Sequence, residues 1–381
     1  MDAGRNEGAY AASVLECSGQ PYAASDPRLR AACSQTCRNL LAKVDPRLLE
    51  DALVSFVRRL LRGKWLDRAL LCGCVCIAVD GTLCERKRGA GLSPKERRRY
   101  ALEARVLTPW GWNIPVMSEP VAAYDGDREK QDCELAAFKR LAPRLKGAFP
   151  HLPVCIVGDA LYACSPVMEV CRGFGWKFLL TFKEGSMPET HGAALAAQLR
   201  RRHCGYEGVR DGDGGGRVVG AVTWASADEV CYELGRDPGF NVVSYVCFDV
   251  REGAYSGAFA TNLDVNEVAR ALEVVAWGRR RWNVENGFKV EKHSGFGLEH
   301  TFCNDETAGR NYHVLMQVAY ALWQVFDGGM LRRLGEGCRK MTQEEWARLL
   351  ASALRFVGLA AFPPASVVGM RMRRFHFAEA A

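Results

Sequence analysis

Two aspartates in this sequence each directly follow an apolar run, a position at which a charged side chain is unusual for a hydrophobic core. Asp80 follows the run Cys72–Val79, and Asp159 follows the run Pro153–Gly158. Continuous apolar runs of this length are typical of strands buried on both faces. Carboxylates at strand ends are suited to bind a divalent cation, because hard cations prefer oxygen ligands. A plain turn built on Asp80 and Gly81 is the simpler alternative, since this dipeptide favours turns.

A third carboxylate, Glu285, lies in a charged segment with helical spacing. Arg281 precedes it by four residues and Lys292 follows it by seven, so on a helix the three side chains share one face. Trp282 and Lys289 then turn toward other faces of the helix. A solvated helix with an ordinary ladder of ion pairs would show the same pattern. The two aspartates upstream favour a chemical role for Glu285.

The elements around the two aspartates follow a definite order. The sequence predicts strands at 72–79, 100–107 and 112–121, a helix that ends near Gly147, a strand at 153–158, a helix at 166–171 and a strand at 176–182. This is the order of a ribonuclease H-like α/β fold with a mixed sheet. In that architecture the first and fourth strands are neighbours, so Asp80 and Asp159 would lie side by side at one edge of the sheet. Carboxylates that close repel each other, and a bound divalent cation relieves the repulsion.

A β-rich insertion then separates the second aspartate from Glu285. Strands are predicted near 218–224, 229–233, 241–249 and 255–261, after a glycine-rich turn at 211–216 that lacks the lysine of a phosphate-binding loop. A helix at 265–276, capped by Asn262 or Asp264, leads into the segment that carries Glu285.

We therefore expect five parts in the chain. They are a helical, partly disordered N-terminal segment (1–70), the first part of the catalytic core (71–190), the β-rich insertion (191–261), the closing helices of the core with Glu285 (262–328), and a helical C-terminal segment (329–381) with a helix at 343–357 and a basic tail at 371–374.

The composition is that of a soluble protein with a basic surface. Of 381 residues, 48% are hydrophobic and 25% charged, and the net charge is +7. Basic blocks such as the loop at 86–99 suit a polyanion, for which DNA is the natural choice. The 16 cysteines are scattered through apolar runs without a Cys-x-x-Cys pair, which indicates a reducing compartment and argues against a structural zinc site. With no apolar leader and no long apolar window, we expect a cytoplasmic protein.

The chain resembles the DDE transposases of bacterial insertion sequences, in the insertion-sequence-four-like group with a Tyr-x-x-Arg-x-x-x-Glu-x-x-x-x-x-x-Lys signature. The resemblance covers about residues 36–328 and rests on Asp80-Gly81-Thr82, on Gly158-Asp159 and on the segment from Arg281 to Lys292. The chain departs from the signature at its tyrosine, where it has Gly278 with Trp277 beside it. If an aromatic ring there holds the DNA end, Trp277 would have to supply it. The segment before the core is also short for this family.

The resemblance implies an enzyme that moves DNA by cut-and-paste transposition. Asp80, Asp159 and Glu285 would bind Mg²⁺, or Mn²⁺, and catalyse DNA cleavage at the element ends and strand transfer to target DNA.

The resemblance also implies partners and contacts for the protein. The partners would be double-stranded DNA, with its terminal inverted repeats and target, and a second copy of the chain in a homodimer on paired ends. Arg281 and Lys292 would clamp phosphates of the transposon end. We expect further DNA contacts from Trp282 and Lys289, and from Trp224 in the insertion by stacking on a flipped base.

Two other functions fit the same residues. A decayed or domesticated relative would bind DNA without cutting it, and a ribonuclease H-like nuclease would cut without joining. Cleavage assays separate the first from a transposase, and strand-transfer products from a pre-cut end separate the second.

Overall fold

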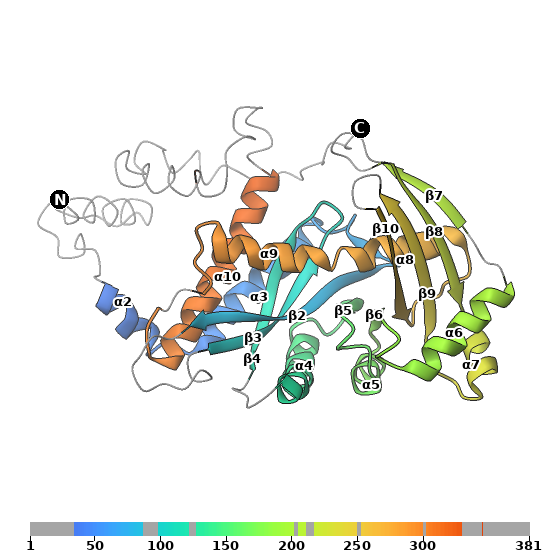
Figure 1. The fold of residues 1–381 in the computed structure, drawn as a ribbon. Coiled ribbons are helices and arrows are strands. Elements are labelled where there is room, and N and C mark those ends of the chain that lie inside the picture. The colour runs from blue at the N-terminus through green and yellow to red at the C-terminus, as the bar shows by residue number, and fades with distance from the viewer. Residues whose placement is uncertain are drawn as a thin grey trace, which may run out of the picture. The chain divides into compact units, whose positions relative to one another are not determined.

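The computed structural model describes residues 34–86, 98–121, 127–201, 205–210, 217–249, 253–299, 302–329 and 345 (Figure 1). The chain forms two compact units, with a smaller one built from described residues up to 49 and from 289 onward, and a larger one from 50 to 288. Several predictions from sequence lie outside the described residues. These are residues 1–33 of the N-terminal segment predicted to be partly disordered, residues 87–97 of the basic loop, the turn at 211–216, the helix at 343–357 apart from residue 345, and the tail at 371–374.

The larger unit is built on a mixed sheet of ten described strands. Their order is β4-β3-β2-β5-β6-β10-β9-β8-β7, with the short β1 paired to β2. The strands are β1 (Leu70–Leu71), β2 (Cys74–Arg86), β3 (Arg98–Leu107), β4 (Asn113–Val121), β5 (Val154–Gly158), β6 (Lys177–Phe182), β7 (Gly205–Arg210), β8 (Arg217–Ala225), β9 (Asn241–Asp249) and β10 (Gly253–Thr261).

Helices cover the sheet of the larger unit on both sides. In Figure 1, α4 and α5 lie below the central strands, and α8 lies along β6, β8 and β9, with which it is in contact. The helices whose residues belong wholly or mainly to this unit are α3 (Pro46–Arg62), α4 (Asp127–Ala148), α5 (Ser165–Gly173), α6 (Pro188–Arg201), α7 (Ala227–Leu234), α8 (Val268–Arg279) and α9 (Trp282–His293).

The central strands have the ribonuclease H-like arrangement that the sequence predicts. β2 runs antiparallel to β3 and parallel to β5, and β5 runs parallel to β6. The register pairs Ala78 of β2 with Val157 of β5. Asp80 and Asp159 each lie two residues beyond this pair, so the two residues are neighbours across β2 and β5. The predicted end of the first strand at residue 79 is wrong, because β2 continues to Arg86 and Asp80 lies within it, whereas Asp159 directly follows β5. β3 and β4, which correspond to the strands predicted at 100–107 and 112–121, form a hairpin whose turn is closed by a hydrogen bond from Thr108 N to Trp112 O at 3.0 Å.

The predicted insertion extends the same sheet. β10 pairs antiparallel with β6, in register from Thr261 opposite Leu179, and β9, β8 and β7 follow. The strand predicted at 229–233 is wrong, because these residues belong to helix α7. A capping box between Ser226 and Glu229 starts this helix, and Gly235 ends it in the left-handed conformation at φ 73°.

The predicted cap of the helix after the insertion is also wrong. Helix α8 begins at Val268 with Glu267 at its N-cap, and no side chain caps it. The side chain of Asn262 instead accepts a hydrogen bond from Phe178 N at 2.7 Å and donates one to Trp176 O at 3.1 Å. Asn262 therefore fixes the end of β10 against β6, an interaction between segments that are remote in the sequence.

The smaller unit contains α2 (Ser34–Leu41) and α10 (Glu306–Gly329), which pack against each other. Asn311 of α10 is fully buried, and its amide nitrogen donates to the carbonyl oxygens of Leu41 and Val44, both at 2.7 Å. One bond satisfies the carbonyl group of Leu41, the last residue of α2, and the other that of Val44, three residues beyond the helix. Asn311 thus joins two segments that are about 270 residues apart in the chain.

Asn311→Ala is expected to lower the free energy of unfolding by about 1–3 kcal/mol, since two carbonyl groups lose their donor in a buried site. Urea denaturation of the full chain measures this change. Asn39→Ala, on the exposed side of α2, is the matched control and should change the value by less than about 0.5 kcal/mol. Equal effects of the two substitutions would show that the Asn311 bonds contribute little.

Candidate active site

The three carboxylates predicted from sequence come from three elements of the larger unit. Asp80 lies within β2, Asp159 directly follows β5, and Glu285 lies in the first turn of α9. Asp159 and Glu285 are close enough to Asp80 for their negative charges to raise its pKa. The side chain of Asp159 also accepts a hydrogen bond from Leu161 N at 2.9 Å, which fixes the turn after β5. The fold therefore gathers the three predicted side chains around one point.

Asp80 is the most perturbed of these carboxylates. Its side chain is 18% exposed. Burial raises the pKa of Asp80 to about 7, with further increases from the charges of Asp159, Glu285 and Glu134, against the opposing effect of Arg281. A carboxyl group with this pKa, buried among other carboxylates, is typical of functional sites.

Arg281 lies between two of the carboxylates. Its Nη1 atom is 2.8 Å from Glu285 Oε1 and 3.9 Å from Asp80 Oδ2. The residue is 9% exposed, and its guanidinium lies 5.2 Å from the centre of the Trp282 ring. The ion pair between Arg281 and Glu285 that the alternative of a simple ladder of ion pairs requires is therefore present. In this structure the guanidinium faces protein carboxylates, where it supplies the positive charge that they require.

The donor chemistry of the site fits Mg²⁺ or Mn²⁺, which prefer carboxylate oxygens. Across the described residues, no group of three or more Asp, Glu, His or Cys side chains has the spacing of a metal-binding set. Glu285 Oε1 lies 2.8 Å from Arg281 Nη1, so binding of a cation by Asp80, Asp159 and Glu285 would have to compete with this ion pair.

Glu134, on α4, is a fourth carboxylate at this site that sequence analysis missed. A Cβ atom on Gly81 would lie 2.7 Å from Glu134 Oε1, so the carboxylate of Glu134 rests against the backbone next to Asp80. Tyr162 is fully buried beside it, and burial together with the charge of Glu134 raises the pKa of Tyr162 well above its usual range. One sequence signal was available, because Glu134 lies four residues before Phe138, on the apolar face of the predicted helix.

Glu134→Gln is expected to lower the pKa of Asp80, because it removes a neighbouring negative charge and leaves the shape of the side chain unchanged. Carboxyl ¹³C chemical shifts of the aspartates, followed over pH in metal-free buffer, measure this pKa. Gly81→Ala should act in the same direction by pushing the Glu134 carboxylate away. Glu189→Gln, an exposed site on α6, should have no effect. An unchanged Asp80 pKa in Glu134→Gln would show that Glu134 does not act on the site.

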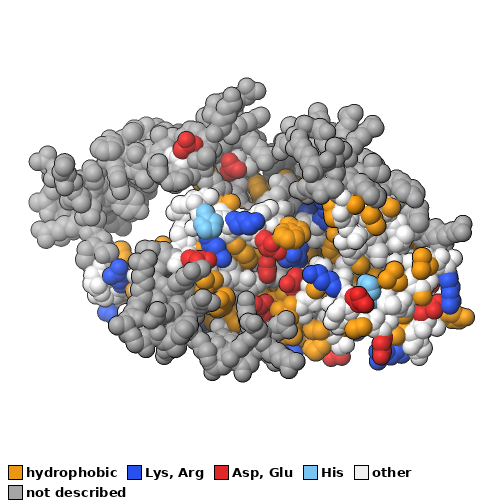
Figure 2. Space-filling model, in the orientation of Figure 1, with side chains coloured by type: hydrophobic (Ala, Val, Ile, Leu, Met, Phe, Trp, Pro, Cys, Tyr) orange, Lys and Arg blue, Asp and Glu red, His pale blue; other side chains and the backbone are white. Residues whose placement is uncertain are grey.

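The residues predicted to contact DNA differ in how accessible they are. Trp282 is 57% exposed, and Lys289 is exposed on the part of α9 that belongs to the smaller unit. Lys292, in the same unit, forms an ion pair with Glu299 at 3.1 Å. Trp224 is only 6% exposed, so the prediction that its ring stacks on a base conflicts with its position in the core of the insertion. Figure 2 shows acidic and basic side chains mixed on the face of the molecule that it presents.

The glycine at the tyrosine position of the signature has a packing explanation. A Cβ atom on Gly278 would clash with the ring of Phe259, which reaches α8 from β10. Trp277, the predicted substitute for the tyrosine, is 3% exposed, and the guanidinium of Arg280 lies 4.9 Å from its ring centre. Trp277 therefore has no open face for DNA. The ring of Phe259 stacks on Tyr245 at 5.5 Å, so an aromatic pair of the insertion fills the space beside Gly278.

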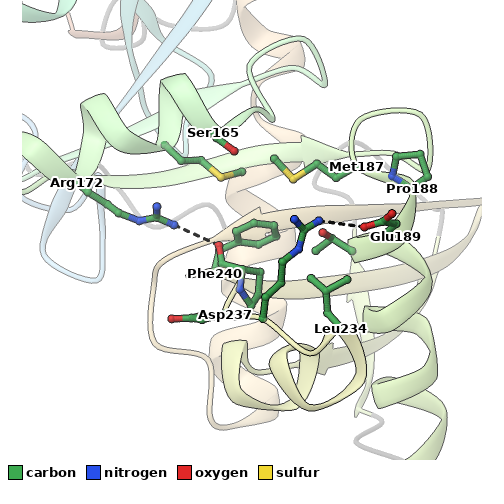
Figure 3. A pocket seen from close by; sticks show the side chains of 12 residues that line it. Ser165, Arg172, Met187, Pro188, Glu189, Leu234, Asp237 and Phe240 are labelled. Carbon is green, nitrogen blue, oxygen red and sulfur yellow. Dashed lines mark hydrogen bonds and ion pairs between the residues drawn. The ribbon is translucent and has the colours of Figure 1, made fainter.

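A pocket of about 500 Å³ lies apart from the carboxylates, between α5, α6 and the end of α7 (Figure 3). Its charged groups bind other protein groups. Arg236 pairs with Glu189 at 3.0 Å, and Arg172 donates to Gly239 O at 2.9 Å. The pocket contains none of the residues of the carboxylate site.

Comparison with known proteins identifies the family. The family model described as Transposase DDE domain matches residues 131–322, slightly more than half of the chain. The chain belongs to the transposase DDE domain family. The matched range of this DDE transposase domain contains Asp159 and Glu285 and begins after Asp80. No curated protein matches the chain.

One solved structure similar to this DDE transposase domain protein is the cryo-EM structure of the piggyBac transposase synaptic complex with hairpin DNA. The two chains are 10% identical and superpose with a TM-score of 0.42 over 75% of this chain and 53% of the piggyBac chain. The present chain thus spans about half the length of that protein. Within the described residues, no helix is both long and apolar enough to cross a membrane.

Proposed function

We propose that this protein is a metal-dependent transposase of the insertion-sequence type, which cuts DNA at the ends of its element and joins those ends to target DNA. The observation that carries the proposal is the convergence of Asp80, Asp159 and Glu285 from β2, β5 and α9. Membership of the transposase DDE domain family supports the same reaction class.

The three carboxylates would hold two Mg²⁺ or Mn²⁺ ions, whose chemistry is to activate the attacking hydroxyl and to stabilise the leaving 3′-oxygen. Asp80 would bind as the carboxylate and give up the proton that it partly retains near neutral pH. Partial burial of Asp80, whose side chain is 18% exposed, would strengthen the electrostatic interactions around it. The protein contributes mainly positioning and charge, as expected for phosphoryl transfer.

Arg281 would exchange one anion for another during the reaction. In the structure it pairs with Glu285. When that carboxylate binds a cation, the planar guanidinium is available for a phosphate of the transposon end, to which it can donate two hydrogen bonds. The exposed ring of Trp282 lies next to it and is open to the same DNA. We propose double-stranded DNA as the partner and a homodimer on paired ends as the active assembly.

Joining of a pre-cut end separates this proposal from its alternatives. The full chain is incubated with Mg²⁺, a DNA that ends at the terminal repeat with a free 3′-hydroxyl, and a target plasmid. A transposase produces strand-transfer products. A nuclease of the same fold nicks DNA without joining it, and a decayed DNA-binding relative does neither although it binds the end.

A further inference from the structure

A buried ion pair lies on β3, the strand next to Asp80. Glu103 and Arg105 are both fully buried, and Arg105 Nε donates to Glu103 Oε2 at 2.8 Å. Arg105 Nη1 donates to Asn113 Oδ1 on β4 at 3.0 Å. Burying two charges is costly, and apolar residues of similar size often give equal or greater stability. An ion pair in this position therefore suggests a role other than stability.

The ion pair belongs to the same face of the sheet as Asp80. The register of β2 and β3 places Glu103 directly opposite Asp80. Side chains of directly opposed residues point to the same face, with Cβ atoms about 4.5–5.5 Å apart, and Arg105, two residues further along, shares that face. An uncompensated Glu103 would add a negative charge beside a carboxylate that already has Asp159 and Glu285 as neighbours. The guanidinium of Arg105 compensates that charge.

The same guanidinium contacts the helix that carries Glu285. Arg105 Cζ lies 4.3 Å from the centre of the Phe288 ring, in the geometry of a cation–π interaction. A Cβ atom on Gly287 would clash with Asn113 Oδ1 and would lie 3.0 Å from Arg105 Nη1, so only glycine permits this close approach. Residues 287 and 288 of α9 therefore rest on Arg105 and Asn113, within one helical turn of Glu285.

We propose that Arg105 is a positioning residue of the active site, which neutralises Glu103 beside Asp80 and seats α9 through Phe288 so that Glu285 faces Asp80. The inference rests on the proposed function, because it concerns the arrangement of the proposed metal-binding carboxylates. Arg105 is fully buried, so its side chain is not exposed for contact with DNA. It acts through Glu103 and through α9.

The test replaces the ion pair with apolar residues of similar size, Glu103→Leu with Arg105→Met. The pair is exchanged as a whole because Arg105→Met alone would leave Glu103 buried and uncompensated. We expect the double variant to fold with a melting temperature near that of the wild type, and to bind Mn²⁺ about tenfold more weakly or worse. Electron paramagnetic resonance of free Mn²⁺, with the full chain, measures the affinity. The exposed pair provides a matched control, Glu189→Leu with Arg236→Met, which should bind Mn²⁺ like the wild type.

Two further variants separate positioning from a general effect on packing. Phe288→Leu keeps the buried ion pair and removes the ring, and should weaken Mn²⁺ binding by about threefold. In a Glu285→Gln background the double exchange should lower the affinity by a smaller factor than in the wild type, because part of its effect passes through Glu285. Phe288→Leu also tests the inference if the double variant does not fold.

The outcomes are distinct. Wild-type affinity for Mn²⁺ in both the folded double variant and Phe288→Leu would overturn the role of Arg105 and leave the proposed function standing. Failure of the wild type itself to bind Mn²⁺ would remove the proposed function and, with it, this inference. Weaker binding in both variants, with the control pair unchanged, supports the positioning role.

Discussion

Glu285→Gln should reduce DNA cleavage by about 10³-fold or more while leaving DNA binding intact. Glutamine has the shape of glutamate without its charge, so α9 and its packing are preserved. In the structure, Glu285 Oε1 lies 2.8 Å from Arg281 Nη1. The amide oxygen of glutamine can still accept a hydrogen bond from Arg281 at this position. The lost feature is a negative oxygen ligand for a divalent cation. Removal of one negative charge should leave the affinity for DNA equal or slightly higher, because the DNA backbone is an anion.

Cleavage of a labelled terminal repeat under single-turnover conditions, with binding measured on the same DNA, checks this result. Glu299→Gln is the matched control, since this glutamate lies in the following segment and pairs with Lys292. The Glu299→Gln variant should cleave within about threefold of the wild type, as expected for a partly exposed ion pair that contributes little. The assignment of Glu285 would be wrong if its glutamine variant kept more than a tenth of the wild-type rate, or if both variants lost activity equally.

Asp80→Asn should stabilise the metal-free protein at pH 8 but not at pH 4. The pKa of Asp80 is about 7 in the folded chain against an ordinary value of 3.8. A carboxyl group whose pKa is raised on folding contributes stability fully below its unfolded pKa and loses it as the pH rises through the folded pKa. In the wild type this loss therefore falls between about pH 4 and pH 7. Asparagine does not ionise, so the variant avoids the loss.

The size of the effect follows from the shift. The shift in the pKa of Asp80 corresponds to an upper bound of about 4 kcal/mol on the change in free energy of unfolding. Water near the partly exposed carboxyl group screens its charge, so we expect the variant to gain about 2 kcal/mol at pH 8. Urea denaturation in the presence of a chelator, at pH 4 and at pH 8, measures the difference between variant and wild type. Asp51→Asn, at an exposed position of α3, should give the same difference at both pH values. If Asp80→Asn also gave the same difference at pH 4 and pH 8, that result would contradict the raised pKa of Asp80.

The adjacency of Asp80 and Asp159 was predictable from local sequence. Each carboxylate ends an apolar run, and the order of the elements requires the two strands to be neighbours, as the parallel pairing of β2 and β5 confirms. The helix with Glu285 was predictable for a similar reason, because the spacing between Arg281 and Glu285 is an i, i+4 pair, which the structure contains.

Other features depend on contacts that the sequence does not display. The segment 229–233 contains the short apolar run Val230-Cys231-Tyr232, yet the capping box at Ser226 and the glycine at 235 make it part of helix α7. Those two signals were present in the sequence and outweigh the apolar run. Glu134 reaches Asp80 only because Gly81 lacks a side chain. The clash that excludes any larger residue at 278 comes from Phe259, which is nineteen residues earlier in the chain. Such effects arise from tertiary packing.

The most direct test of the central claim is the dependence of cleavage on a divalent cation. The purified full chain is mixed with DNA that carries the terminal inverted repeat of its own element, with Mg²⁺, with Mn²⁺, or with a chelator alone. We predict a cut at the end of the repeat with either cation and none with the chelator. Binding of the repeat without cleavage in any of these conditions would contradict the claim that Asp80, Asp159 and Glu285 form a catalytic metal site.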